Sequence, residues 1–182
     1  MYALSVVTAR CHVEVLTWTI HHAPDCSVPG EEGLNAYVKL NGALFADKLS
    51  CGSSHTNPSL TRGTNFQLLH PFSCSVIEHR AFDTNEAGPA DRLRDYLDQL
   101  DDFSVIVGSM TEDATMNLRN AHNALLRVGV DLRDVLIMGT FAFVTQKSTN
   151  ETVLRKVRLG ADSHDNPANV SVMITGKIRE NR

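Results

Sequence analysis

Two helical segments lie in the middle of a chain whose other segments carry the pattern of β-strands, and this order constrains the fold more than any other feature. The first helix is predicted to begin at Gly88-Pro89, because proline suits a first helical turn, where its missing N–H costs no hydrogen bond. Its apolar stripe, at the i, i+3, i+4 and i+7 spacing of one helical face, consists of Leu93, Tyr96, Leu97 and Leu100. Helices set among strands predict an α+β fold, with the helices packed on antiparallel sheet.

The second helix is predicted from about Ala114 to Arg127, with Gly129 at the position where a left-handed C-terminal cap is common. Strand patterns cover residues 12–20, 36–40, 43–46, 64–69, 74–82, 103–107, 135–144, 152–159 and 170–175. Asn41-Gly42 between two of them is the strongest local signal, since both residues tolerate the positive φ of a hairpin turn. Gly108 is predicted to end the strand of residues 103–107.

The bulk composition excludes several classes of protein. The 182 residues suit one domain, 1–182, and 42% apolar with 21% charged residues is ordinary for a globular chain. Seventeen basic residues stand against 21 acidic ones, a formal net charge of −4, which argues against nucleic acid as a partner. No run of apolar residues is long enough for membrane insertion.

The four cysteines, at Cys11, Cys26, Cys51 and Cys74, have no C-x-x-C spacing. Their even number favours two disulfides, with three connectivities open; pairing of neighbouring segments favours Cys11–Cys26 and Cys51–Cys74. The alternative is four reduced thiols. Sequons at 150–152 and 169–171 also suit a secreted glycoprotein. We therefore expect an extracellular protein whose leader peptide is not part of this sequence.

Catalytic motifs are missing from the sequence: there is no G-x-S-x-G, no Gly-rich phosphate loop and no H-E-x-x-H. The best metal candidate is the set Cys11, His12, His21 and His22. His12 and His22 are too far apart on one extended strand to bind a single ion, so surface histidines are the favoured interpretation. We expect no enzyme activity, no metal and no cofactor.

The acidic pair Glu112-Asp113 lies between the strand of residues 103–107 and the second helix. Acids there complement the helix dipole and cap exposed N–H groups, which is the common structural role. The same turn would also present carboxylates at the end of a sheet, where they could accept hydrogen bonds from sugar hydroxyls. The two roles are compatible.

Six short motifs follow one another along the chain: Y-V-K-L-N-G at 37–42, R-G-T-N at 62–65, R-A-F-D-T at 80–84, E-D-A-T at 112–115 with Leu118, A-L-L-R-V-G at 124–129, and T-F-A-F-V at 140–144 with Lys147. In these motifs residues 37–147 resemble the ILEI (interleukin-like EMT inducer) domain family, and are similar to the carbohydrate-binding stem domain of the O-mannose-linked N-acetylglucosaminyltransferase. The resemblance implies a compact β-β-α fold of two antiparallel sheets flanked by short helices. Residues 1–35 and 152–176 are then expected to complete the sheets.

The resemblance also implies a function without catalysis. In the glycan-binding branch the pocket is formed by an arginine, which Arg62 matches, and an acid, which Glu112 or Asp113 matches. The third part departs from the family pattern: residues 137–141 lack an arginine and an aspartate, and Phe141 replaces a tryptophan. Phe141 is expected either to stack on a sugar or to belong to the core of a buried strand.

Two functions remain. The favoured one is a secreted, lectin-like module that binds a glycan or glycoprotein through Arg62, Glu112, Asp113 and Phe141. The alternative is a secreted cytokine-like signalling or adhesion ligand with a protein receptor. A homo-oligomer is compatible with either function.

Overall fold

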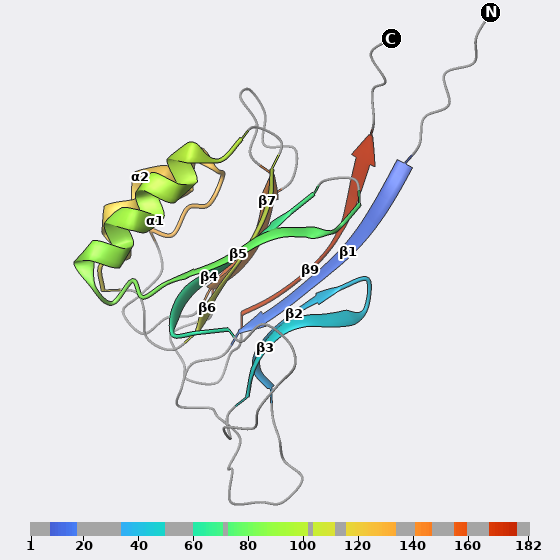
Figure 1. The fold of residues 1–182 in the computed structure, drawn as a ribbon, viewed down its shortest axis with the longest axis horizontal. Coiled ribbons are helices and arrows are strands. Elements are labelled where there is room, and N and C mark those ends of the chain that lie inside the picture. Colours follow the sequence, from blue (N-terminus) through green and yellow to red (C-terminus); the bar gives the residue numbers. More distant parts are fainter. Residues whose placement is uncertain are drawn as a thin grey trace, which may run out of the picture.

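The computed structural model of the chain describes residues 8–17, 34–49, 60–70, 73–101, 104–111, 116–133, 141–146, 155–159 and 168–177, with all the helices and strands drawn in Figure 1. Two antiparallel sheets and a layer of short helices make up this part of the chain. The predicted α+β class is confirmed.

The first sheet has four strands, and it joins the two ends of the described chain. Its order is β3 (Ala43–Leu49), β2 (Leu34–Leu40), β1 (Thr8–Thr17) and β9 (Ala168–Lys177). β1 and β9 pair over their whole length, from Thr8 opposite Lys177 to Thr17 opposite Ala168. The two strands therefore lie side by side in Figure 1 although they are the first and last in the sequence.

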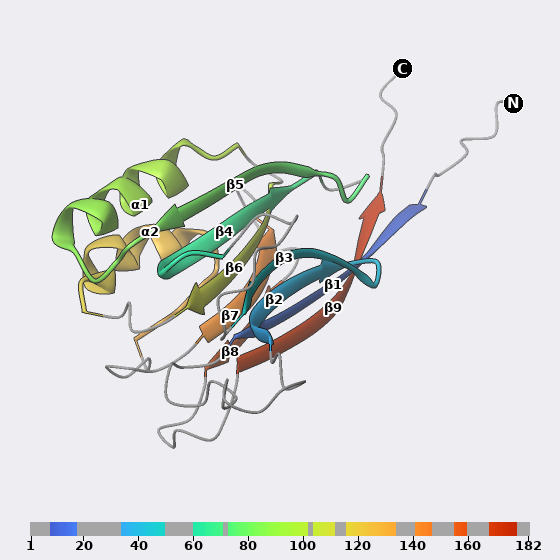
Figure 2. The ribbon, with the colours of Figure 1, turned by 60° about the horizontal axis from the view of Figure 1, so that its bottom comes forward.

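The second sheet has five strands, in the order β5 (Val76–Phe82), β4 (Gly63–Leu69), β6 (Val105–Thr111), β7 (Phe141–Gln146) and β8 (Arg155–Leu159). All neighbouring pairs are antiparallel. The helices α1 (Ala87–Gln99) and α2 (His122–Arg127), with the 3-10 turn η2 (Leu118–Ala121), lie together on one side of this sheet (Figure 2). The molecule thus has three layers: helices, five-stranded sheet and four-stranded sheet.

The central strands of the five-stranded sheet, β4, β6 and β7, are buried on both faces, to which successive strand residues point in turn. On β6, Ile106 and Met110 belong to the core against the helices, whereas Val105 and Val107 belong to the core against the other sheet. A hydrogen bond from the Thr17 hydroxyl to the Met110 carbonyl also joins the two sheets. This explains the near-continuous apolar runs of its central strands.

Several predicted elements are confirmed. Asn41 and Gly42 have φ values of 52° and 81° and connect β2 to β3 as a hairpin. Helix α1 buries Leu93 and Leu97 against the sheet, as the apolar stripe predicted. Gly129 has a φ of 84°, and the N–H groups of Gly129 and Val130 bond to the carbonyls of Leu126 and Leu125. That pattern is a Schellman cap at the end of α2.

Element boundaries differ from the predictions at several places, and three of the differences concern the first strand, the second helix and the strand that contains Gly108. The first strand spans residues 8–17 instead of 12–20, since its limits are set by pairing with β9. The second helix is a 3-10 turn plus the short α2 from Leu118, preceded by a turn at 116–117. Residues 112–115 lie outside the described part.

The third difference concerns Gly108, which does not end its strand. β6 continues through Gly108 to Thr111, and Gly108 is paired with Phe66 on one side and Phe143 on the other. A Cβ at this position would lie 2.2 Å from the ring of Phe143. Glycine is used here because an aromatic ring covers the backbone.

The predicted disulfide pairing is wrong. Cys11 on β1 is bonded to Cys74, just before β5, with their Cα atoms 5.6 Å apart. The prediction assumed that cysteines pair between neighbouring segments, whereas packing of the two sheets brings together cysteines 63 residues apart. Cys26 and Cys51 lie outside the described residues. Among the helices that the structure describes, none combines the length and apolar character needed to cross a membrane.

Candidate functional site

The turn into β4 is shaped by Gly63. Its φ is 107°, and a Cβ on this residue would lie 2.1 Å from the carbonyl oxygen of Phe82. An L side chain therefore fits neither the backbone conformation nor the space. The close approach of the two backbones places Arg62, the residue before Gly63, at the very end of the five-stranded sheet.

Arg62 is exposed and is held beside an acid. Its Nε lies 3.5 Å from Oδ2 of Asp83, and the side chains of Arg62 and Asp83 are 52% and 32% exposed. A pair this exposed contributes little to stability. Its main effect is to orient the guanidinium group at the end of the sheet.

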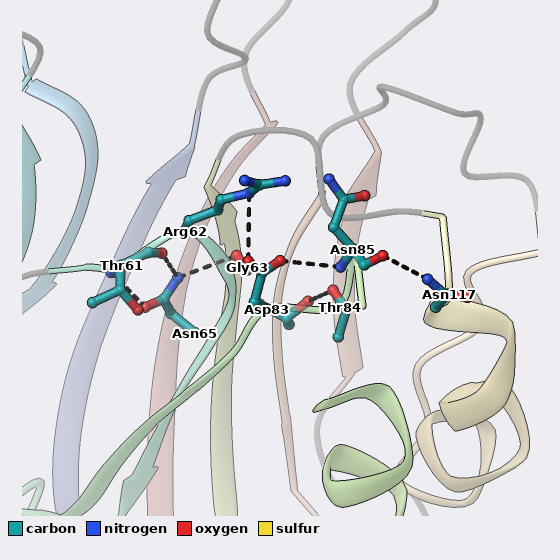
Figure 3. A network of polar contacts seen from close by, with 9 residues as sticks. Thr61, Arg62, Gly63, Asn65, Asp83, Thr84, Asn85 and Asn117 are labelled. Carbon is teal, nitrogen blue, oxygen red and sulfur yellow. Dashed lines mark hydrogen bonds and ion pairs between the residues drawn. The ribbon is translucent and has the colours of Figure 1, made fainter. Parts of the chain in front are cut away.

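One buried amide fixes the chain on the other side of Arg62. Asn65 accepts a hydrogen bond from the N–H of Thr61 at 3.0 Å and donates to the carbonyls of Thr61 and Gly63 at 2.8 and 3.2 Å. Asn65 is fully buried. The backbone that carries Arg62 is thus tied down on both sides of the residue (Figure 3).

The turn after β5 is tied to the helical layer. The hydroxyls of Thr64 and Thr84 lie 3.0 Å apart. Asn117 makes two hydrogen bonds to this turn. Its backbone N–H donates to the carbonyl of Thr84 at 3.1 Å, and its side-chain amide donates to the carbonyl of Asn85 at 2.6 Å. These bonds give a rigid base under Arg62.

Asn85 adds an acceptor beside the guanidinium. Its side chain points to the same side as that of Arg62 (Figure 3). The Asn85 Oδ1 is shielded from solvent and has no hydrogen-bond partner within the described part of the chain. The backbone N–H of Asn85 donates a hydrogen bond to Oδ1 of Asp83 at 3.2 Å, so Asn85 is bonded to the acidic partner of Arg62. Arg62 and the turn that carries Asn85 are therefore held together through Asp83.

The predicted site residues have different outcomes. Arg62 lies where the sequence placed it, at the end of a sheet. Glu112 and Asp113 are outside the described residues; the residue before them, Thr111, is paired with Gly63. Phe141 is fully buried in the core against the helices, its ring centroid 6.1 Å from that of Phe143. It is on a central strand covered on both faces, so its expected role as a stacking platform is not met and we omit it from the site.

Sequence reasoning gave no role to Asp83, Asn85 or Asn117. A signal for Asp83 existed: in a β4–β5 hairpin with Thr64 opposite Phe82, the residue that follows β5 falls beside Gly63 and Arg62. Asn117 had no such signal, because it reaches the site only through packing of the helical layer.

A cleft adjoins this cluster, between β5 and α1. Its volume is about 750 Å³, and its lining includes Glu78, Arg80, Asp83, Glu86, Arg92, Asp95, Tyr96 and Gln99. Tyr96 donates a hydrogen bond to Oε2 of Glu78 at 3.2 Å, and the Arg80 guanidinium carbon lies 5.0 Å from the centre of its ring. Burial, followed by the Glu78 carboxylate, raises the pKa of Tyr96. The tyrosine thus stays protonated and donates.

The described residues contain no group of three or more His, Cys, Asp or Glu side chains suited to a metal ion. Cys11, from the proposed metal set, is bonded to Cys74 and is not available as a thiolate ligand. His21 and His22 lie outside the described residues.

Comparison with known proteins agrees with the resemblance seen in the sequence. The family model described as ILEI, interleukin-like EMT inducer, matches residues 62–149. The match begins at Arg62 and contains β4, β5, α1, β6, α2 and β7. It therefore covers the polar cluster, by which we mean Arg62, Asp83, Asn85 and Asn117, and also the cleft. No curated protein matches the chain. Residues 62–149 of this chain are thus similar to the ILEI family, which agrees with the motifs at 62–65, 80–84 and 124–129.

Proposed function

We propose that this chain is a secreted, non-enzymatic module that binds carbohydrate at the polar cluster around Arg62. The observation that carries the proposal is the exposed Arg62 guanidinium at the end of a sheet, oriented by Asp83 at 3.5 Å. Sugars are bound by planar donors and acceptors at fixed spacing, since vicinal hydroxyls both donate and accept.

The rigidity of the cluster supports this assignment. Arg62 is flanked by a buried amide on one side and by the Thr84–Asn117 hydrogen bond on the other. A binding group that is already held in place loses little conformational entropy when a ligand arrives, so weak polar contacts suffice.

The family supports the same site. The sequence resembles the glycan-binding stem domain of a glycosyltransferase, in which an arginine and an acid form the pocket. Arg62 corresponds to that arginine, and we assign the acid to Glu112 or Asp113, which follow the Thr111–Gly63 pair. Residues 137–141 lack the arginine and the aspartate of the family pocket, and Phe141 is buried. The ligand is therefore expected to differ from that of the stem domain.

A disulfide bond and two glycosylation sequons support secretion. The Cys11–Cys74 disulfide joins β1 to the segment just before β5, and such bonds persist in oxidising compartments. The sequons at 150–152 and 169–171 are acceptors for glycosylation in the same compartments. The partner is then a glycan or glycoprotein outside the cell.

A glycan array probed with the purified chain and with its Arg62→Ala variant tests the proposal. We expect a defined set of glycans bound by the natural chain and lost in Arg62→Ala. Arg119→Ala, a substitution of another exposed arginine in η2, serves as the control and should keep the same glycans. A natural chain that binds nothing on the array, or an Arg62→Ala variant with unchanged binding, would contradict the proposal.

A second candidate is a signalling ligand for a protein receptor. The matching family is described as an interleukin-like inducer. Two apolar side chains near the helical layer are also well exposed, Met116 at 63% and Leu126 at 46%. Binding of the labelled chain to cells before and after enzymatic removal of surface glycans separates the candidates: only a protein receptor keeps binding after that treatment, and only then should Leu126→Ser reduce it.

A further inference from the structure

We propose that the cleft between β5 and α1 is a second sugar subsite, so that the ligand is a neutral oligosaccharide that extends from Arg62 along this cleft. The inference rests on the proposed function and names the class of ligand. It depends on three observations, which concern the position, the chemistry and the rigidity of the cleft.

The cleft is continuous with the Arg62 cluster. Asp83 belongs to both: its Oδ2 lies 3.5 Å from Nε of Arg62, and it lines the cleft. Glu86, at the start of α1, also lines the cleft, and its backbone N–H bonds to the carbonyl of Asp83 at 3.0 Å. A chain of sugar rings bound at Arg62 therefore has a path past Asp83 and Glu86 into the cleft.

The lining suits an uncharged ligand rich in hydroxyls. The cleft has four carboxylates, Glu78, Asp83, Glu86 and Asp95, and two guanidinium groups, Arg80 and Arg92, together with the amide of Gln99. Two of the carboxylates have basic partners, Arg80 for Glu78 and Arg94 for Asp95, and a third has Arg62. Charges balanced in this way give no strong attraction for an anion or a cation. They do present planar donors and acceptors side by side, as hydroxyl pairs require.

The size and the stiffness of the cleft also fit. Its volume of about 750 Å³ lies well within the range of ligand-binding clefts. Tyr96 is fixed by its bond to Glu78 and by ring contacts with Phe82 and Phe66, with centroids 5.6 and 6.3 Å away. Arg80 is held between Glu78 and the Tyr96 ring. Tyr96, Glu78 and Arg80, which line the cleft, are therefore held in place before any ligand binds.

Arg92 and Gln99 provide the cleanest test. Both lie on α1, both line the cleft, and both are exposed, so alanine at either position keeps the helix. Neither belongs to the Arg62 cluster. Arg127→Ala is the matched control, because Arg127 is an exposed helical arginine on α2, paired with Asp98 and not among the residues that line the cleft.

The experiment measures affinity against chain length by calorimetry or NMR titration. The probes are neutral monomers, dimers and trimers built on N-acetylglucosamine, mannose and galactose, together with a sulfated series of the same lengths. In the series that binds, we expect the trimer to bind the natural chain about tenfold more tightly than the monomer. Arg92→Ala and Gln99→Ala should each lose most of this gain while monomer affinity stays unchanged, and Arg127→Ala should keep it.

The outcomes separate the two proposals. If a monomer binds in an Arg62-dependent way but trimers gain nothing, or the gain survives in both cleft variants, the second subsite is wrong and the Arg62 site stands. If no sugar of any length binds, neutral or charged, the proposed function itself fails. If only charged oligosaccharides show the gain with length, the inferred neutral class is wrong.

Discussion

The ring of Phe143 on β7 lies directly over Gly108, its pairing partner on β6, so that a Cβ at Gly108 would be 2.2 Å from Cζ of the ring. Gly108→Ala should therefore cost about 1–3 kcal/mol of folding free energy, as overpacked cores do. Denaturant unfolding of the variant measures this loss.

Two companion variants make the Gly108 result specific. Gly88→Ala on α1 meets only the end of the Arg92 side chain at 3.6 Å and should be neutral or slightly stabilising. Adding Phe143→Leu to Gly108→Ala should recover part of the loss, because the smaller side chain releases the contact. No recovery in the double variant would show that ring contact is not the cause.

Gly63→Ala should be more harmful than an alanine at another glycine of positive φ. At Gly63 the new Cβ would meet the Phe82 carbonyl oxygen at 2.1 Å, whereas at Gly42, with a φ of 81°, nothing lies within 4 Å. We expect about 1 kcal/mol for Gly42→Ala from backbone strain alone and about 2–4 kcal/mol for Gly63→Ala. Thermal melts give the ranking, and equal losses would contradict the steric explanation. Gly63→Ala should also weaken glycan binding, since it displaces Arg62.

The disulfides should map as Cys11–Cys74 and Cys26–Cys51, the second pair following because Cys11 and Cys74 are already bonded. Mass spectrometry of non-reduced digests tests both. Cys11 and Cys74 are separated by 63 residues, so removing their bond with a Cys11→Ala/Cys74→Ala variant should cost about 4 kcal/mol on the chain-entropy estimate. A Cys11–Cys26 peptide in the digest would refute the predicted pairing.

Acid should destabilise the fold through His79. This residue is half-buried on β5, and desolvation lowers its pKa from the ordinary 6.5. The unfolded chain thus takes up a proton near pH 6.5 while the folded state resists it, and stability falls with pH from about 6.5 down to the lowered folded pKa. The melting temperature should drop between pH 7 and pH 5, and His79→Gln should reduce that drop. His122→Gln, in the helical layer, is the control; an equal drop in all three proteins would exclude His79 as the cause.

The local elements of this fold were largely predictable, because their signals are local. Asn41-Gly42 specifies a hairpin by backbone conformation, and the apolar stripe through Leu93 and Leu97 specifies which face of α1 is buried. Gly108 was misjudged for a physical reason: in sequence a glycine after an apolar run indicates a strand end. Its real partner, the ring of Phe143, is 35 residues away and is visible only once β6 and β7 pair.

The candidate site was predictable only in part. Arg62 could be found from the Arg-Gly turn before a strand, and Asp83 follows once the β4–β5 register is known. Asn117 could not be found, since it is brought to Thr84 and Asn85 by the docking of the helical layer. Phe141 could not be assigned correctly either. An aromatic residue on a strand can stack on a sugar if its face of the strand is exposed, or belong to the core if that face is covered, and the sequence does not show which face is covered.

The most direct test of the glycan-binding account is one variant measured in two ways: Arg62→Ala, by affinity for an array-identified glycan and by melting temperature. The account predicts an affinity about ten- to a hundredfold weaker, since a charged hydrogen-bond donor to the sugar is lost. It predicts a melting temperature within about 2 °C of the natural chain, because the Arg62–Asp83 pair is exposed. A lowered melting temperature with unchanged glycan affinity would show that Arg62 is a structural ion-pair partner and would contradict the account.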